Sequence, residues 1–115
     1  MNVTHNTSGK VKILRLSGRF DNYVTHSVNE WLDKNAAEKN SQIIVNLAQV
    51  HFIDSTALAT LVQGLNKCHK YQGDLFLCSL QQQVYMIFEL TRLDKAFNIF
   101  LDEEHALSAF AKYAN

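Results

Sequence analysis

The stretch Ile43-Ile44-Val45-Asn46-Leu47, followed by Ile53-Asp54-Ser55-Thr56-Ala57-Leu58, decides the fold of this chain of 115 residues. The β-branched run at its start favours a strand that is buried on both faces. Asp, Ser and Thr are the residues preferred where a helix begins, because their side chains accept hydrogen bonds from the unpaired N–H groups of the first turn. A buried strand that leads into a helix is the repeating unit of an α/β fold.

The same alternation of strand and helix patterns extends to both ends of the chain. Two short strands over residues 2–7 and 11–16 are joined by Ser8-Gly9, so they must be antiparallel. Helical stripes cover residues 23–39, 55–71, 84–91 and the segment after residue 102, and further strands cover residues 75–78 and 97–101. The sequence predicts a single α/β domain over residues 1–115, with a mostly parallel sheet, an antiparallel N-terminal edge hairpin and about four helices.

Helix ends and faces follow from the residue types. Asp21 or Asn22 is expected to cap the first helix, and Gly73 is expected to end the second. On the second helix, the apolar residues form one stripe, which places Thr60 and Gln63 on the opposite, exposed side.

Composition excludes several classes of function. Eleven Lys and Arg balance eleven Asp and Glu, so the chain lacks the basic surface that binding to nucleic acid requires. No apolar run is long enough to span a bilayer and no signal sequence is visible, which predicts a cytoplasmic protein without membrane insertion. Cys68 and Cys78 lie in apolar segments, so we expect buried, reduced thiols.

The loops that follow the carboxyl ends of parallel strands usually carry the functional residues of such a sheet. These loops are expected at residues 18–22, 48–55, 79–82 and 101–102. In the second of them, Asp54-Ser55-Thr56 can simply cap the helix. The same helix N-terminus also suits a phosphoryl group, because it presents free N–H groups and a partial positive charge. The residues alone leave both interpretations open.

Three motifs together resemble the STAS domains, the fold shared by bacterial anti-sigma factor antagonists and by the cytoplasmic tails of sulfate transporters. Gly18-Arg19-Phe20-Asp21 is similar to the Gly-x-x-Asp motif of the family, and Ile53-Asp54-Ser55-Thr56-Ala57-Leu58 is similar to its Asp-Ser-[Ser/Thr]-Gly-Leu loop. Gly73-Asp74-Leu75 resembles the turn into its fourth strand. The resemblance covers nearly the whole chain and is strongest to the free-standing antagonists.

The resemblance implies a protein-binding switch and no catalytic residues, cofactor or metal. By this resemblance, Ser55 is the residue that is phosphorylated by an anti-sigma factor, which is also a serine kinase. The resemblance also implies a serine phosphatase that reverses the modification. The unmodified protein would bind the anti-sigma factor, as a monomer or weak dimer, and the phosphorylated form would release it. The residues expected at the partner surface are Asp21, Asp54, Thr56, Ala57, Thr60 and Gln63.

Two other functions are compatible with the sequence. A STAS subunit of a membrane lipid-transport complex, or a signalling scaffold, would use the same loop without a phosphate cycle. A small hydrolase would use Ser55 as nucleophile, but the glycines of a GxSxG elbow are missing around it. Ala57 also replaces the glycine usual in the family loop, which bears on the identity of the kinase. The five histidines show no metal-binding spacing.

Overall fold

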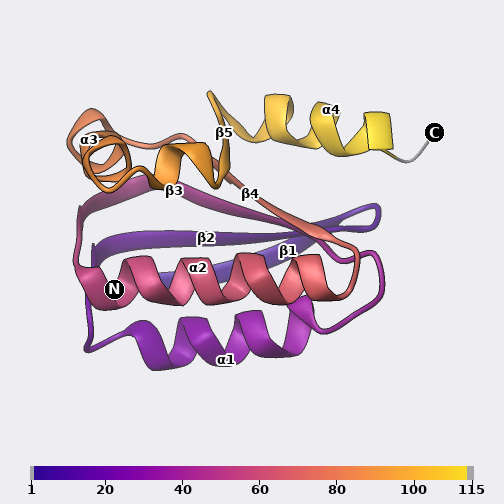
Figure 1. Ribbon diagram of the computed structural model, residues 1–115, viewed down its shortest axis with the longest axis horizontal. Helices are drawn as coiled ribbons and strands as arrows, with labels where there is room; N and C mark the ends of the chain where they lie inside the picture. The colour runs from indigo at the N-terminus through magenta and orange to yellow at the C-terminus, as the bar shows by residue number, and fades with distance from the viewer. Residues whose placement is uncertain (1, 114–115) are drawn as a thin grey trace.

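The computed structural model describes residues 2–113 and shows one mixed sheet with helices on both faces (Figure 1). The strands are β1 (Asn2–Ser8), β2 (Val11–Phe20), β3 (Gln42–Ile53), β4 (Asp74–Cys78) and β5 (Asn98–Phe100). The helices are α1 (Thr25–Ala36), α2 (Ser55–Lys70), α3 (Gln82–Leu90) and α4 (Glu103–Tyr113), with a 3₁₀ turn, η1 (Leu93–Lys95), after α3. Strands lie in the order β1-β2-β3-β4-β5, and only the β1–β2 pair is antiparallel. The predicted α/β class and N-terminal hairpin are confirmed.

Each face of the sheet has its own apolar core. Helices α1, α2 and α3 cover one face, and α1 and α2 lie side by side in Figure 1. That larger core includes Leu14, Val45, Leu61 and Phe88, all fully buried. Helix α4 covers part of the other face, where the rings of Phe76 and Phe110 stack with centroids 3.9 Å apart. The sheet is thus a central layer between two layers of helix.

The N-terminal hairpin turns at Gly9 and Lys10, one residue later than predicted. Ser8 pairs with Val11, and Gly9 has a φ of 61°. A two-residue turn with a left-handed first residue matches the right-handed twist of the strands, and glycine adopts that conformation without steric cost. The turn therefore sets the register of the whole hairpin.

Strands β2 and β3 are longer than predicted. The strand expected to end at Leu16 continues to Phe20, and residues 48–53, expected as a loop, complete β3. The two extensions pair with each other through two register shifts, which interrupt the regular alternation of inward and outward side chains. The extended pair carries the chain directly to the entrances of α1 and α2.

The predicted caps of α1 are wrong. This helix begins at Thr25 and ends at Ala36, and its N-cap residue, Val24, makes no side-chain capping bond. Asp21 and Asn22 instead form a turn ahead of the helix, in which the Asp21 carbonyl accepts a hydrogen bond from the Val24 N–H at 3.1 Å. The first helix is therefore held by its packing on the core and not by a cap.

Helix α2 ends at Lys70, and the residue with the left-handed conformation after it is not the predicted Gly73. Gln72, with a φ of 66°, takes the left-handed position, and its N–H donates to the His69 carbonyl. The Gly73 N–H donates to the Cys68 carbonyl at 2.7 Å, which completes a Schellman motif. Gly73 is needed for close approach: a Cβ atom there would lie 2.1 Å from the Ser41 carbonyl oxygen.

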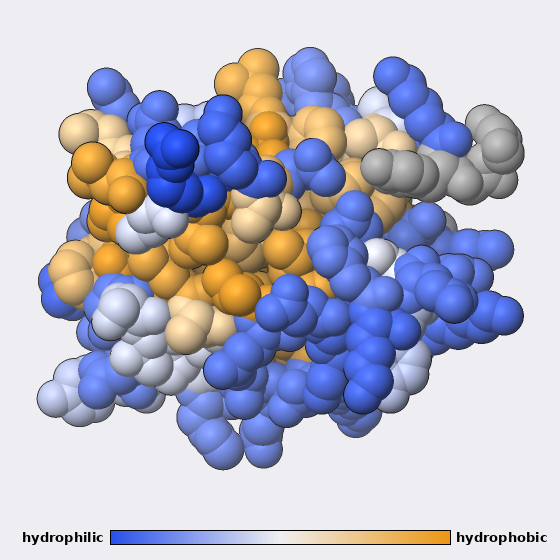
Figure 2. Space-filling view, in the orientation of Figure 1, coloured by the Kyte–Doolittle hydropathy of each residue, from blue (hydrophilic) through white to orange (hydrophobic). Residues whose placement is uncertain are grey.

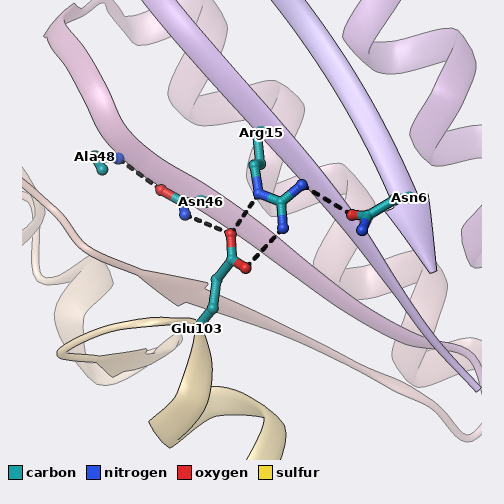
Figure 3. Close-up of polar contacts among 5 residues, drawn as sticks. All are labelled: Asn6, Arg15, Asn46, Ala48 and Glu103. Atoms are coloured by element: carbon teal, nitrogen blue, oxygen red, sulfur yellow. Dashed lines mark hydrogen bonds and ion pairs between the residues drawn. The ribbon is translucent and has the colours of Figure 1, made fainter. Parts of the chain in front are cut away.

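An ion pair fixes the start of α4 against the sheet (Figure 3). The Arg15 guanidinium on β2 donates to both carboxylate oxygens of Glu103, at 2.7 and 2.8 Å. The Asn46 amide donates to the same carboxylate at 2.6 Å, and Asn6 accepts from Arg15 at 3.0 Å. These bonds to Arg15 and Asn46 lower the pKa of Glu103 from its ordinary value, against the opposing effect of burial.

We expect Gly73→Ala to lower the free energy of unfolding by about 2 kcal/mol or more, because the new methyl group must displace the Ser41 backbone. Gly64→Ala is the matched control within α2. Its Cβ would meet only side-chain atoms of Leu32 and Leu75, at 3.0 Å or more, and alanine is favoured in a helix. Urea unfolding followed by circular dichroism compares the two. Equal shifts of the midpoint would contradict the role given to Gly73.

We expect Glu103→Gln to destabilise the fold by about 1 kcal/mol at neutral pH, a modest figure because the Arg15 side chain is 41% exposed and water screens the pair. Glu104→Gln, exposed on the same turn, is the control. The folded pKa of Glu103 is lowered, so the contribution is full above the ordinary glutamate pKa and is lost as the pH falls through the lowered one. The difference between wild type and Glu103→Gln should shrink as acid is added. A difference independent of pH would argue against the ion pair.

Candidate functional site

The Asp54 carboxylate joins the two loops that meet at the carboxyl end of the sheet. Its Oδ1 accepts a hydrogen bond from the Ala57 N–H at 2.9 Å and so caps α2. Its Oδ2 accepts from the Asn22 N–H in the β2–α1 loop at 3.0 Å. The Asp54 N–H in turn donates to the Phe20 carbonyl at 3.2 Å. The capping role predicted for Asp54 is confirmed, and the same side chain also fixes the neighbouring loop.

Ser55 and Thr56 are the first two residues of α2, and both are exposed. The Ser55 hydroxyl makes no hydrogen bond to any residue of the described chain. The N–H groups of the first helical turn lack partners within the helix and carry partial positive charge. The Ala57 N–H of this turn is bonded to Asp54, so a phosphoryl group on Ser55 would meet the other N–H groups of the first turn and the favourable field of its own helix.

Asp21 lies on the loop that Asp54 holds, which brings these two predicted carboxylates into one site. Its Oδ1 accepts from the Tyr23 N–H at 3.1 Å, and its Oδ2 lies 3.6 Å from Nε of Arg19. The Arg19 guanidinium lies over the ring of Phe52, 3.8 Å from the centroid. The sequence reasoning missed Arg19 and Phe52. Their contact depends on the pairing of Arg19 with Phe52 across the extended β2 and β3 strands.

Two residues expected at the partner surface are not on the surface. Thr60 is only 6% exposed, and its hydroxyl donates to the Thr56 carbonyl one turn earlier, so the prediction of an exposed Thr60 is wrong. The Ala57 side chain is fully buried in the larger core. Gln63 is exposed, as predicted. The accessible part of the predicted set is thus Ser55, Thr56 and Gln63, beside the half-buried Asp21 and Asp54.

An apolar surface lies next to this site, between α2 and α3. Figure 2 shows hydrophobic side chains gathered over that part of the molecule. We name as the apolar patch the partly buried residues that pack on the larger core there, together with the exposed residues of α3: Val62, Leu80, Ile87, Leu93, Met86 and Leu90. Exposed apolar area of this kind marks surfaces that bind other proteins.

The cysteines and histidines of the described chain form no reactive or metal-binding group. Cys68 and Cys78 are free and buried, as predicted, and burial raises the pKa of Cys78 to about 11, so its thiol stays protonated. In the described part of the chain, no group of three or more His, Cys, Asp or Glu side chains is placed to hold a metal ion. No histidine among these residues bonds to the Ser55 hydroxyl, and both Asp54 oxygens are already occupied by backbone N–H groups.

One cavity lies at the other end of the sheet, where β3 and β4 begin. It has a volume of about 470 Å³, and Gln42, Asp74 and Lys10 are among the residues that line it. None of the predicted site residues lies there.

Across residues 2–113, every helix is too short or too polar to cross a membrane.

Comparison with known proteins finds relatives of this chain among the anti-sigma factor antagonists. The chain is 24% identical over 99 residues to the anti-sigma F factor antagonist of Paenibacillus polymyxa, covering 85% of each chain. It is also 24% identical over 99 residues to the anti-sigma-B factor antagonist of Staphylococcus aureus, covering 86% of this chain and 92% of the relative.

Solved structures of similar proteins share the fold. An anti-sigma factor antagonist (STAS) domain protein from Planctomyces limnophilus superposes with a TM-score of 0.86 at 18% identity, covering 95% of this chain and 97% of that one. A Bacillus cell-fate determinant in its phosphorylated form gives 0.73 at 15% identity, over 95% and 99%. A sulfate transporter family protein from Wolinella succinogenes gives 0.75 at 23% identity, over 90% and 86%.

The sequence model of the STAS domain matches residues 2–106, which is most of the chain. The match includes both loops that Asp54 connects, and the predicted resemblance is confirmed. The chain belongs to the STAS domain family and is similar to bacterial anti-sigma factor antagonists.

Proposed function

We propose that this protein is an anti-sigma factor antagonist whose binding is switched by phosphorylation of Ser55. It acts in the cytoplasm as a single domain without catalytic residues, and its partner is an anti-sigma factor that is also a serine kinase. The unmodified protein binds that partner, the phosphorylated protein releases it, and a serine phosphatase restores the first state. The single observation that carries the proposal is the exposed, unbonded hydroxyl of Ser55 at the N-terminus of α2, beside the apolar patch.

The local electrostatics support a change in binding without a change in fold. Phosphorylation adds a charge of about −1.5 to −2 at neutral pH. Within the domain, the N-terminus of α2 offsets this charge. Toward a partner, the phosphate adds to the carboxylates of Asp54 and Asp21 at one place, and like charges brought together in an interface cost several kcal/mol of binding. Arg19 does not cancel this charge freely, because Asp21 and the Phe52 ring already hold its guanidinium.

The apolar patch supplies the attractive part of the proposed interface. Four of its residues, Val62, Leu80, Ile87 and Leu93, pack on the larger core, which anchors the patch to the fold, whereas Met86 and Leu90 are exposed. Burial of apolar area favours association between proteins, and charged residues at the rim of an interface affect its specificity and rate of formation. Partner binding would then need both the patch and an uncharged Ser55.

A second candidate function is a STAS subunit or scaffold of a membrane transport or signalling complex. The observation that favours it is the superposition on a sulfate transporter family protein, reported above. Such a protein would use the same surface without a phosphate cycle. The two functions differ in one respect: only the first requires transfer of phosphate to Ser55.

We expect a cognate anti-sigma kinase and ATP to add one phosphoryl group to this protein, at Ser55, as read by mass spectrometry. Ser55→Ala should abolish the modification, whereas Thr56→Ala, which removes the neighbouring exposed hydroxyl, should leave it unchanged. Ser55→Asp should weaken binding to the same kinase by about tenfold or more, because one added charge costs at least 1.4 kcal/mol at such an interface. Circular dichroism should show the same fold for all three variants.

Two results would sink the phosphate switch. One is a panel of the anti-sigma kinases encoded in the source genome, none of which modifies Ser55. The other is a phosphorylated protein that holds its kinase as tightly as the unmodified form. Binding to a membrane-transport complex that is unaffected by Ser55→Asp would then favour the second function.

We expect Leu90→Ser to weaken binding to the anti-sigma factor by about tenfold while leaving the stability unchanged, because this side chain is 80% exposed and lies in the apolar patch. Leu101→Ser is the matched control: it removes the same side chain at 77% exposure, from the link between β5 and α4. Isothermal titration calorimetry compares the two. Equal losses of affinity, or none, would place the interface elsewhere.

A further inference from the structure

Strand β1 leaves one edge of the sheet open. It is the outermost strand, and its seven residues pair with β2 in one unbroken register, from Asn2 with Ser17 to Ser8 with Val11. In the described part of the chain, no helix packs extensively on β1, and β2 is its main contact. The outer row of backbone groups on β1 therefore faces solvent.

The hairpin geometry identifies these outer groups. Ser8 and Val11 flank a two-residue turn, so they form a hydrogen-bonded pair. Alternate residues of an antiparallel strand bond to the same neighbour, which directs Asn2, Thr4 and Asn6 toward β2 as well. The N–H and C=O groups of Val3, His5 and Thr7 consequently point away from the sheet.

This edge lacks the devices by which proteins usually block strand addition. The segment Asn2–Ser8 contains no Lys, Arg, Asp, Glu or Pro, and its register shows no bulge. The opposite edge is different: β5 has only three residues, and α4 packs against it. Of the two edges, only β1 is long, straight and uncharged.

We propose that β1 pairs with β1 of a second copy of this chain, in antiparallel orientation, about a two-fold axis at His5. The edge is complementary to itself in this arrangement, because His5 then faces His5 of the other copy and Val3 faces Thr7. Each of these facing pairs exchanges two N–H···O bonds. No charged side chains of β1 are brought together, and the resulting interface closes on itself as an isologous dimer.

The choice of a second copy over another extended segment rests on this fit and on the absence of charged residues from β1, which lets two copies meet without like-charge repulsion. A two-fold axis at His5 uses every outward-facing group of Val3, His5 and Thr7, with none left over. Ser55 lies on α2, and the apolar patch lies on α2, α3, η1 and the link between β4 and α3, so none of these residues belongs to the paired strands. The pairing therefore does not require the proposed phosphate switch, and the failure of one proposal would not refute the other.

The position of Trp31 gives the dimer an optical signal. Trp31 is the only tryptophan of the chain, and its ring centroid lies 6.0 Å from that of His5. A cavity of about 270 Å³ beside the edge is lined by both of these side chains and by Thr7. A second copy at the edge would change the surroundings of that ring.

The test is sedimentation equilibrium of the full chain over protein concentrations on the order of 10 µM to 1 mM, with Trp31 fluorescence followed in parallel. We expect a reversible monomer–dimer equilibrium in this range. His5→Pro removes the N–H at the two-fold axis, at an edge position where proline is tolerated, and should weaken association by about tenfold or more. His5→Lys places two ammonium groups opposite each other and should do the same. His5→Thr keeps the N–H and adds no charge, so it should still dimerise.

Three outcomes would overturn the proposal. The first is a wild-type protein that stays monomeric at the highest concentration. This result would overturn the proposal even if the β1 edge bound other peptides. The second is a dimer that both His5→Pro and His5→Lys leave intact. The third is a dimer that His5→Thr weakens as strongly as they do. If circular dichroism shows that His5→Pro is unfolded, His5→Lys decides, because a side chain on an exposed strand does not disturb the ladder to β2.

Discussion

The arrangement of the site depends on one carboxylate. Asp54 accepts one hydrogen bond from the first turn of α2 and another from the β2–α1 loop, so a single side chain fixes the relative position of two segments that are far apart in the sequence. Both oxygens accept from backbone N–H groups, and neither is hydrogen-bonded to the Ser55 hydroxyl. The Ser55 hydroxyl is left exposed and chemically unassisted, which suits a group that another protein modifies.

The class and order of the elements could be predicted because buried strands and amphipathic helices have different periods. The carboxyl-terminal end of β3 could not be predicted from the sequence. Residues 48–52 alternate between exposed and buried positions, and they form a strand only through irregular pairing with the equally unexpected end of β2. The burial of Thr60 was not predicted for a different reason. Its hydroxyl donates to the Thr56 carbonyl of its own helix, so the side chain can be buried without a polar partner elsewhere.

Prediction of the local structure around Asp54 succeeded because it depended on neighbours in sequence. The cap at Asp54 and the exposed Ser55 follow from local preferences at a helix start. The bond from Asn22 to Asp54 and the contact of Arg19 with Phe52 join residues from different loops and strands, so they require the register of β2 against β3. Local chemistry thus predicted the capped start of the helix, and only the tertiary structure showed which charges surround Ser55.

The two proposals have a joint consequence if both hold. A dimer paired through β1 would carry two Ser55 sites on one continuous sheet, each beside its own apolar patch. A partner that is itself a dimer could then bind both patches at once, and the second contact would benefit from the high effective concentration created by the first. Phosphorylation of one Ser55 would remove that advantage as well as one contact. Release would therefore be steeper than the loss of a single site predicts, although no residue of β1 touches the phosphate.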